Sequence, residues 1–326
     1  MVFALPTSFV APVRYNSVNC FYRFILNFSV VITLTCFFTP PAYSSATTST
    51  QTTGTSFFKL GVEKILHGNY QEAIQYLTQE IQSHGNVAAA YSNRCLAELQ
   101  LQDYQKAIAD CNQAIHFAPK NVEAYLNRGL AHYRQGNYLD AIADNNQVIA
   151  LQPYDFRAYY NRGVVNTTLE NYQQAITDYN LALSQIPQFP SHQIAEIYND
   201  RGLARFKLQD LQAAMLDFSL AIRLNPKDDR AYFNRGCACG KHGDNLNAVR
   251  DFSEVIRLNP NNGKAYFNRG VANHLLGYQQ AAIADLQKAV EHFRYQKQRL
   301  ACEKTLNLIK MIQQKISSEL EIALGF

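Results

Sequence analysis

One pattern recurs along the chain at a nearly constant spacing. The stretch AYFNRG occupies 231–236 and is repeated letter for letter at 265–270. Looser copies precede both, and aligning all of them on the last residue of the stretch gives spacings of 34, 34, 34, 39, 34 and 34 residues. The register positions are Gly61, Cys95, Gly129, Gly163, Gly202, Gly236 and Gly270. Such a period indicates stacked repeats, each contacting mainly its neighbours, in place of one globular core.

Small residues and prolines define the structure expected of one repeat. The residue twelve positions after every register position is alanine, as at Ala107 and Ala141. Small residues on both arms allow two helices to approach closely. Prolines near the ends of most repeats, such as Pro119 and Pro153, stop the second helix. Each repeat is therefore predicted to be a helix–turn–helix pair that buries its apolar faces only by stacking on its neighbours.

The period, the glycine, the alanine and the terminal proline together resemble the tetratricopeptide repeat (TPR). The resemblance covers 54–296 and implies an all-α fold, a right-handed superhelical solenoid of about seven repeats with a C-terminal capping helix. The NRG form, with its AIAD and NQAI blocks, is similar to repeats common in cyanobacterial proteins. Residues 297–326 are expected to form the capping helix and a tail. The repeats are expected at 54–87, 88–121, 122–155, 156–194 with an insertion around 189–193, 195–228, 229–262 and 263–296.

The N-terminal segment 1–46 contains no acidic side chain and is predicted to be a secretory signal peptide. A basic lead precedes an apolar stretch at 24–38, and small residues follow near Ser44. The alternative is an uncleaved membrane anchor, but the apolar stretch is shorter than the roughly 20 residues that span a bilayer. Residues 47–53 are expected to be a polar linker. We expect an exported protein of the periplasm, or of the thylakoid lumen if the source is cyanobacterial.

Charge and motif content exclude several classes of function. The chain has 30 Lys and Arg against 26 Asp and Glu, a net charge of +4, and no basic run. This balance argues against nucleic-acid binding, and membrane contact is expected only through an uncleaved N-terminal segment. No glycine-rich phosphate loop, GxSxG or HExxH motif occurs, and the histidines do not cluster with carboxylates. We therefore predict no catalysis, no metal and no cofactor.

The cysteines outside the N-terminal segment lie within helical patterns. The main expectation is that they act as small buried apolar residues. Cys95 and Cys111 lie on the two helices of one repeat, so a disulfide between them is an open alternative. Cys237 and Cys239 point in different directions on a helix, so a shared metal or redox site is the weaker alternative.

An arginine and an aspartate occur together in six of the seven repeats, one residue before and fifteen residues after the register position. The first repeat has Leu60 and Tyr76 there and lacks both charges. Pairing within a repeat leaves no charge without a partner, whereas pairing between repeats does. We predict bidentate bonds that join the two helices of a repeat, against the alternative of an arginine ladder for an anionic ligand. The pairs are Arg94–Asp110, Arg128–Asp144, Arg162–Asp178, Arg201–Asp217, Arg235–Asp251 and Arg269–Asp285.

A partner is then expected on another face of the first helices. Residues three before and one and four after the register position share one helical face, which the TPR resemblance implies lines a concave groove. In this chain the face is apolar and aromatic with cationic borders, as interaction hot spots are. The alternative is that the stripe packs against neighbouring helices. The predicted groove residues are Leu126, Leu130, Tyr133, Arg157, Tyr160, Phe206, Lys207, Arg230, Phe233, Lys264 and Phe267.

These features predict a non-catalytic scaffold that binds partner proteins or peptides in the groove. One alternative is an assembly factor for a membrane complex, photosynthetic if the source is cyanobacterial. A weaker alternative is a thiol-based carrier of a metal or cofactor. The chaperone-tail receptors of the TPR family are not matched, because Leu126, Tyr160, Phe233 and Phe267 stand where their clamp lysine would.

Overall fold

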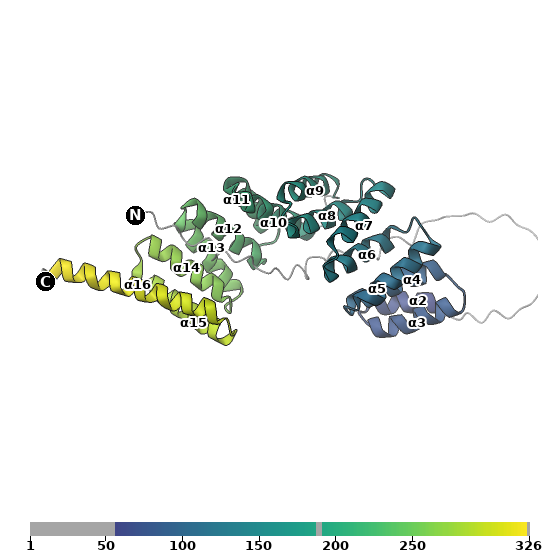
Figure 1. The fold of residues 1–326 in the computed structure, drawn as a ribbon, viewed down its shortest axis with the longest axis horizontal. Coiled ribbons are helices and arrows are strands. Elements are labelled where there is room, and N and C mark those ends of the chain that lie inside the picture. The colour runs from purple at the N-terminus through teal and green to yellow at the C-terminus, as the bar shows by residue number, and fades with distance from the viewer. Residues whose placement is uncertain (1–55, 187–190, 325–326) are drawn as a thin grey trace, which may run out of the picture. The chain divides into compact units, whose positions relative to one another are not determined.

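The computed structural model describes residues 56–186 and 191–324, and every regular element in these ranges is an α-helix (Figure 1). The signal peptide predicted for 1–46 and the linker at 47–53 lie outside the described residues, as do 187–190 around the insertion. The fifteen helices of the described ranges are α2 (Phe57–Leu66), α3 (Tyr70–Gln82), α4 (Val87–Gln100), α5 (Tyr104–Phe117), α6 (Val122–Gln135), α7 (Tyr138–Leu151), α8 (Phe156–Thr168), α9 (Tyr172–Gln185), α10 (Ser191–Lys207), α11 (Leu211–Leu224), α12 (Asp229–His242), α13 (Asn245–Leu258), α14 (Gly263–Leu275), α15 (Gln279–Tyr295) and α16 (Arg299–Leu324).

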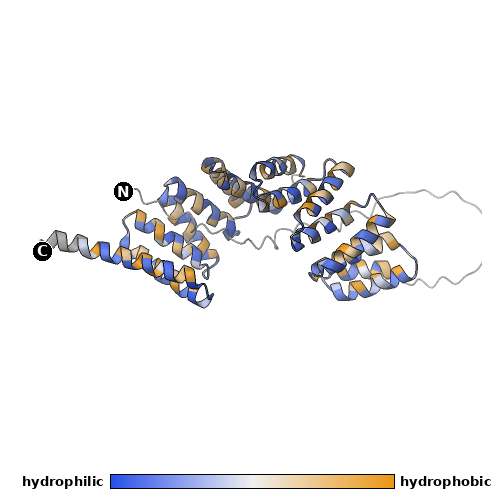
Figure 2. Ribbon diagram, in the orientation of Figure 1, coloured by the Kyte–Doolittle hydropathy of each residue, from blue (hydrophilic) through white to orange (hydrophobic). Residues whose placement is uncertain are grey.

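The helices pack in consecutive pairs. In the pairs α2/α3, α4/α5, α6/α7, α10/α11, α12/α13 and α14/α15, the second helix packs against the first. The second helix of one repeat also packs on the first helix of the next, for example α5 on α6 and α11 on α12. Apolar and polar residues alternate along each helix (Figure 2). The predicted all-α fold of stacked helix–turn–helix repeats is therefore the fold of the protein.

The repeats divide between two compact units, which we describe separately. The N-terminal unit ends at Val165 and the C-terminal unit begins at Asn166, so the boundary falls within α8. The N-terminal unit contains α2 to α7 and most of α8. The C-terminal unit contains the end of α8 and α9 to α16.

The register glycines are needed where the two helices of a repeat cross. In the fifth repeat a Cβ atom at Gly202 would lie 2.8 Å from the ring of Phe218. In the sixth repeat a Cβ atom at Gly236 would lie 3.0 Å from the ring of Phe252. Both phenylalanines are buried on the second helices, α11 and α13. The glycine therefore makes room for a large side chain of the second helix. This packing explains why glycine recurs at the register position along the chain.

Every repeat turns between its helices through a residue with positive φ, seven positions after the register position. Four of these residues are glycines and three are not. The left-handed region favours glycine, so Gln102, Glu170 and Gln209 hold a strained backbone there. The glycines are Gly68, Gly136, Gly243 and Gly277.

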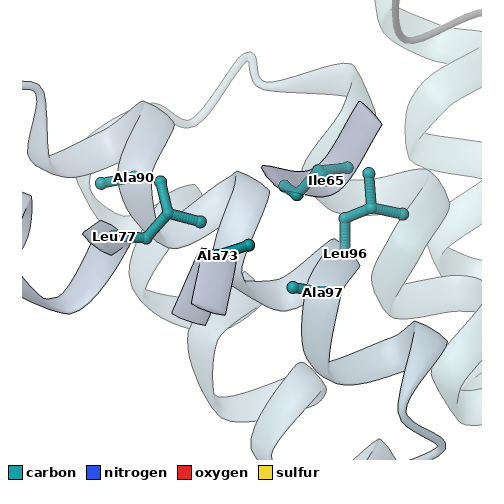
Figure 3. Close-up of a cluster of buried hydrophobic side chains, with 6 residues drawn as sticks. All are labelled: Ile65, Ala73, Leu77, Ala90, Leu96 and Ala97. Carbon is teal, nitrogen blue, oxygen red and sulfur yellow. The ribbon is translucent and has the colours of Figure 1, made fainter. Parts of the chain in front are cut away.

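The first repeat replaces the small residue of the second helix with Glu80, which is only 7 % exposed. Its carboxylate accepts hydrogen bonds from the backbone N–H groups of Phe58, at 3.1 Å, and Asn86, at 2.8 Å. One buried side chain thus provides the hydrogen-bond acceptor for backbone N–H groups at the start of α2 and at the turn into α4. Next to it, a cluster of apolar residues from α2, α3 and α4 joins the first repeat to the second (Figure 3): Ile65, Ala73, Leu77, Ala90, Leu96 and Ala97.

The C-terminal helix α16 packs on α15 of the last repeat. Leu286 and Val290 of α15 form a cluster with Ile309 and Ile312 of α16. This contact covers the outer face of the last repeat, as the predicted capping helix should. Within the described part of the chain, no helix has the length and apolar character needed to cross a membrane.

Candidate partner-binding surface

The predicted arginine–aspartate pairs are present in five repeats. In each, the arginine Nε and Nη2 donate to the two carboxylate oxygens of its aspartate at distances between 2.6 and 3.0 Å. The arginine side chains are 14 to 26 % exposed and the aspartates are buried. Arg162 and Asp178 belong to different compact units, so their pairing stays a prediction. The five pairs are Arg94–Asp110, Arg128–Asp144, Arg201–Asp217, Arg235–Asp251 and Arg269–Asp285.

Each arginine also makes a contact that the sequence analysis missed. Its Nη1 donates, at 2.6 to 3.1 Å, to a polar side chain on the second helix of the preceding repeat. The acceptors stand seventeen residues after each register position and are all Thr, Asn or Ser, so the signal was present in the sequence. The arginine therefore joins two repeats as well as two helices. The acceptors are Thr78, Asn112, Asn146, Asn180, Ser219 and Ser253.

A tyrosine completes the environment of each arginine. In all six repeats the guanidinium carbon lies 5.2 to 5.9 Å from the ring centroid of the tyrosine three residues before it, as Arg235 does over Tyr232. This is the geometry of a cation–π contact. Because the donors and the flat faces of these arginines are used within the fold, the arrangement favours the structural role over the arginine ladder for an anionic ligand.

The second repeat replaces the glycine contact with a disulfide. Cys95 stands at the register position on α4, Cys111 stands on α5, and their Cα atoms are 5.4 Å apart. Both residues are fully buried. The main expectation, that the cysteines act only as small buried apolar residues, is wrong for this pair, which is buried but forms the disulfide left open as an alternative. Sequence spacing could not decide between the alternatives, because a disulfide requires a Cα separation that only the helix packing sets.

The remaining cysteines of the described ranges are free. Cys239 is buried, and burial raises the pKa of its thiol to about 11. Its sulfur contacts Met215 at 3.5 Å, while Cys237 receives a weak contact from Asn268 at 3.9 Å. A thiol with a raised pKa is a poor nucleophile and metal ligand. In the described ranges, no three His, Cys, Asp or Glu side chains are placed to hold a metal ion.

The predicted groove residues separate into a buried set and a partly exposed set. Leu126, Leu130 and Tyr160 are at most 3 % exposed, and Phe206 is 6 % exposed. Their burial favours the alternative reading, in which this part of the stripe packs within the fold. The residues with accessible surface are Tyr133, Arg157, Lys207, Arg230, Phe233, Lys264 and Phe267.

Two phenylalanines of the partly exposed set pack against aromatic rings of the second helices. Phe233 on α12 packs edge-on against Phe252 of the second helix, with ring centroids 5.6 Å apart. Phe267 on α14 makes a tilted contact with Phe293, at 6.5 Å. Both residues are partly exposed, and each also packs against a buried apolar cluster of the C-terminal unit. Rigid aromatic side chains of this kind lose little conformational entropy when a partner binds.

The two arginines of the predicted groove are neutralised inside the protein. Arg157 donates to Asp155 at 2.7 Å and to Glu123 of the preceding repeat at 2.8 Å. Burial alone lowers the pKa of Arg157, but the hydrogen bonds and charges of these two carboxylates outweigh it, and the pKa is raised. Arg230 donates to Asp228 at 2.6 Å and lies 3.9 Å from the buried carboxylate of Glu196.

Three lysines differ from these arginines. Lys207, Lys241 and Lys264, on α10, α12 and α14, have no carboxylate within 4.0 Å among the described residues. The ammonium group of Lys241 lies 5.3 Å from the ring centroid of Phe206 on the neighbouring first helix. Burial raises the pKa of the Cys237 thiol on α12, and the positive charge of Lys264 opposes this rise. The C-terminal unit thus carries positive charge on the same first helices as the partly exposed Phe233 and Phe267.

Models of the TPR family match most of the repeat region. A model described as TPR repeat matches 96–136, and models described as tetratricopeptide repeat match 126–191, 195–228 and 233–297. These ranges cover more than half of the chain, which therefore belongs to the TPR family. No curated protein sequence matches it at a significant level.

Solved structures share this fold. The structure of YrrB, described as a TPR protein with an unusual peptide-binding site, is 22 % identical with a TM-score of 0.50 and covers 60 % of this chain and 97 % of its own. PilF of Pseudomonas aeruginosa is 15 % identical with a TM-score of 0.59, covering 68 % and 97 %. A tetratricopeptide repeat protein of Parabacteroides merdae is 18 % identical with a TM-score of 0.57, covering 77 % and 97 %. At these identities the likeness is one of fold, and the TPR fold supports the binding of proteins or peptides in general.

Proposed function

We propose that the protein is a non-catalytic scaffold that binds a segment of a partner protein on the first helices of its C-terminal unit. The observation that carries the proposal is the pair Phe233 and Phe267, partly exposed on consecutive first helices and fixed from behind by other aromatic rings. Aromatic anchors in fixed positions contribute much of the energy of protein–protein interfaces. The recurring arginines, which could have been binding groups, are used by the scaffold.

The test compares capture of proteins by the purified wild type with capture by Phe233→Ala/Phe267→Ala. The matched control is Leu139→Ala/Leu246→Ala, which removes two large apolar side chains, 79 % and 56 % exposed, from second helices. All three proteins must first show the same helicity and cooperative unfolding. We expect a partner captured by the wild type and by the control variant to be lost from the phenylalanine variant. A partner kept by the phenylalanine variant and lost from the control would move the site to the second helices.

We also propose that the protein is exported. The N-terminal segment supports export by its basic lead and apolar stretch. The disulfide between Cys95 and Cys111 supports it independently, since such bonds persist mainly in oxidising compartments. An envelope fraction of the native host is therefore the source in which to look for partners, including those of membrane complexes. Recovery of the mature protein from the cytoplasm, with both thiols reduced, would contradict export.

A further inference from the structure

The two groove arginines have carboxylate partners in both units, whereas three lysines of the C-terminal unit have none among the described residues. In the N-terminal unit Arg157 is bonded to two carboxylates, and Glu123 supplies one of them from the preceding repeat. In the C-terminal unit Arg230 is bonded to Asp228 and lies near Glu196. The lysines at 207, 241 and 264 have no carboxylate within 4.0 Å among the described residues. A positive charge that the fold does not neutralise is available to a ligand.

These charges are interleaved with aromatic side chains. Lys207 follows Phe206 directly on α10, and Lys241 of α12 reaches back over the ring of Phe206 at 5.3 Å. Lys264 stands one helical turn before Phe267 on α14. We call the set Lys207, Phe233, Lys241, Lys264 and Phe267 the lysine–phenylalanine surface. Two of the three lysines thus lie next to a phenylalanine, Lys241 over the ring of Phe206 and Lys264 one turn before Phe267.

We propose that the lysine–phenylalanine surface binds an acidic peptide segment in which aspartate or glutamate residues alternate with aromatic or aliphatic ones. The proposal rests on the proposed function and names the chemistry of the partner. Carboxylates of the peptide would pair with the three ammonium groups while its apolar side chains pack on Phe233 and Phe267. Because the lysines stand on three successive repeats, the segment must be long enough to cross them, as an extended peptide is.

Two features favour a peptide over a nucleic acid. The surface holds three unpaired cations, whereas tight binding to a phosphate backbone needs more charges, usually including arginines that contact the phosphates. Here the arginine guanidinium groups are occupied by aspartates and by neighbouring repeats. Apolar rings between the charges match a chain that alternates charged and apolar side chains.

The experiment selects peptides from a phage-displayed library of random twelve-residue sequences on the purified protein. The test variant is Lys207→Gln/Lys241→Gln/Lys264→Gln. The matched control is Lys59→Gln/Lys120→Gln/Lys310→Gln, which removes the same charge from exposed lysines on other helices and loops. We expect the wild type and the control to select peptides rich in Asp and Glu beside Phe, Tyr, Leu or Ile. A synthetic copy of a selected peptide should bind the test variant about tenfold more weakly, and NaCl should weaken its binding to the wild type.

Other outcomes overturn the inference in distinguishable ways. Selection of apolar peptides without acidic residues, lost on Phe233→Ala/Phe267→Ala, would leave the proposed function standing and remove the acidic partner. Equal affinity of the acidic peptide for the wild type and the lysine variant would show that these lysines do not bind it. Displacement of the peptide by a single-stranded oligonucleotide at lower concentration than by free peptide would assign the surface to nucleic acid. Failure of the wild type to select any peptide would count against the proposed function itself.

Discussion

The two compact units are built from the same repeat and differ in the side chains at positions that do not recur from repeat to repeat. Both tie their helices with the same arginine–aspartate pair, as Arg128–Asp144 and Arg235–Asp251 show. The N-terminal unit then adds a disulfide and buries the leucines of its apolar stripe, Leu126 and Leu130. The C-terminal unit packs phenylalanines against glycine and keeps rings such as Phe233 partly exposed. The recurring positions thus define the scaffold. The positions between them determine whether side chains on the first helices are buried within the fold or remain accessible to a partner.

The largest expected effect tests the feature that the units share. Asp144→Ala and Asp251→Ala should each destabilise the protein by about 3 kcal/mol, because each leaves a guanidinium group without its carboxylate. Denaturant unfolding measures both losses. Double-mutant cycles with Arg128→Ala and Arg235→Ala should show coupling above about 1 kcal/mol in both units. Independent, additive losses in either unit would mean that the pair there contributes packing alone.

The second prediction separates the units. Reduction of the disulfide, or Cys95→Ala/Cys111→Ala, should destabilise the N-terminal unit by about 3 kcal/mol, the value for a loop of this length. Hydrogen exchange should then accelerate in α4 and α5 while α12 and α13 keep their protection. Cys237→Ala/Cys302→Ala is the control, since these thiols are free. Unchanged exchange in α4 after reduction would show that packing alone holds the second repeat.

The third prediction concerns the turns, which recur in both units. Gln102→Gly and Gln209→Gly should each stabilise the protein by about 0.5 to 1 kcal/mol, because glycine adopts the positive φ of these positions without strain. Gly136→Ala should destabilise by a similar amount for the same reason. Thermal unfolding measures all three, and Gln102→Ala, which should not stabilise, controls for loss of the side chain. A gain from alanine equal to the gain from glycine would point to the glutamine side chain as the source of strain.

Periodicity explains how much of this could be predicted from the sequence. The pairing of Arg235 with Asp251 was readable because both charges are present in six repeats and both are absent from the first. The bond from Arg235 to Ser219 was equally predictable, since a small polar residue recurs at that position. It was missed because the acceptor is uncharged and the search was for paired charges. Glu80 could not be understood from sequence, because its partners are backbone N–H groups. The exposure of Phe233 against the burial of Leu126 depends on how successive first helices pack, which the repeat pattern does not encode.

The smallest effect expected is at Glu98, where the N-terminal unit departs from the rest of the chain. In three other repeats the residue at this position donates to the aspartate of the pair, as Asn166 does to Asp178 and Asn273 to Asp285, at 3.0 and 3.1 Å. Glu98 is 7 % exposed, and burial, together with the charge of Asp110, raises its pKa above the usual value of 4.5. The folded state therefore binds this proton more tightly than the unfolded state does.

The sign of the pH dependence follows from that difference. The contribution of Glu98 to stability is greatest below pH 4.5 and decreases as the pH rises through the raised pKa of the folded state. Glu98→Gln should remove this decrease and stabilise the protein at neutral pH, because its amide can donate to Asp110. Unfolding of both proteins at a series of pH values from acid to neutral measures the effect, and their difference should grow with pH. A difference that stays constant or shrinks as the pH rises would show that Glu98 is solvated or paired in the folded state. The second repeat would then not be destabilised by a buried carboxylate at this position.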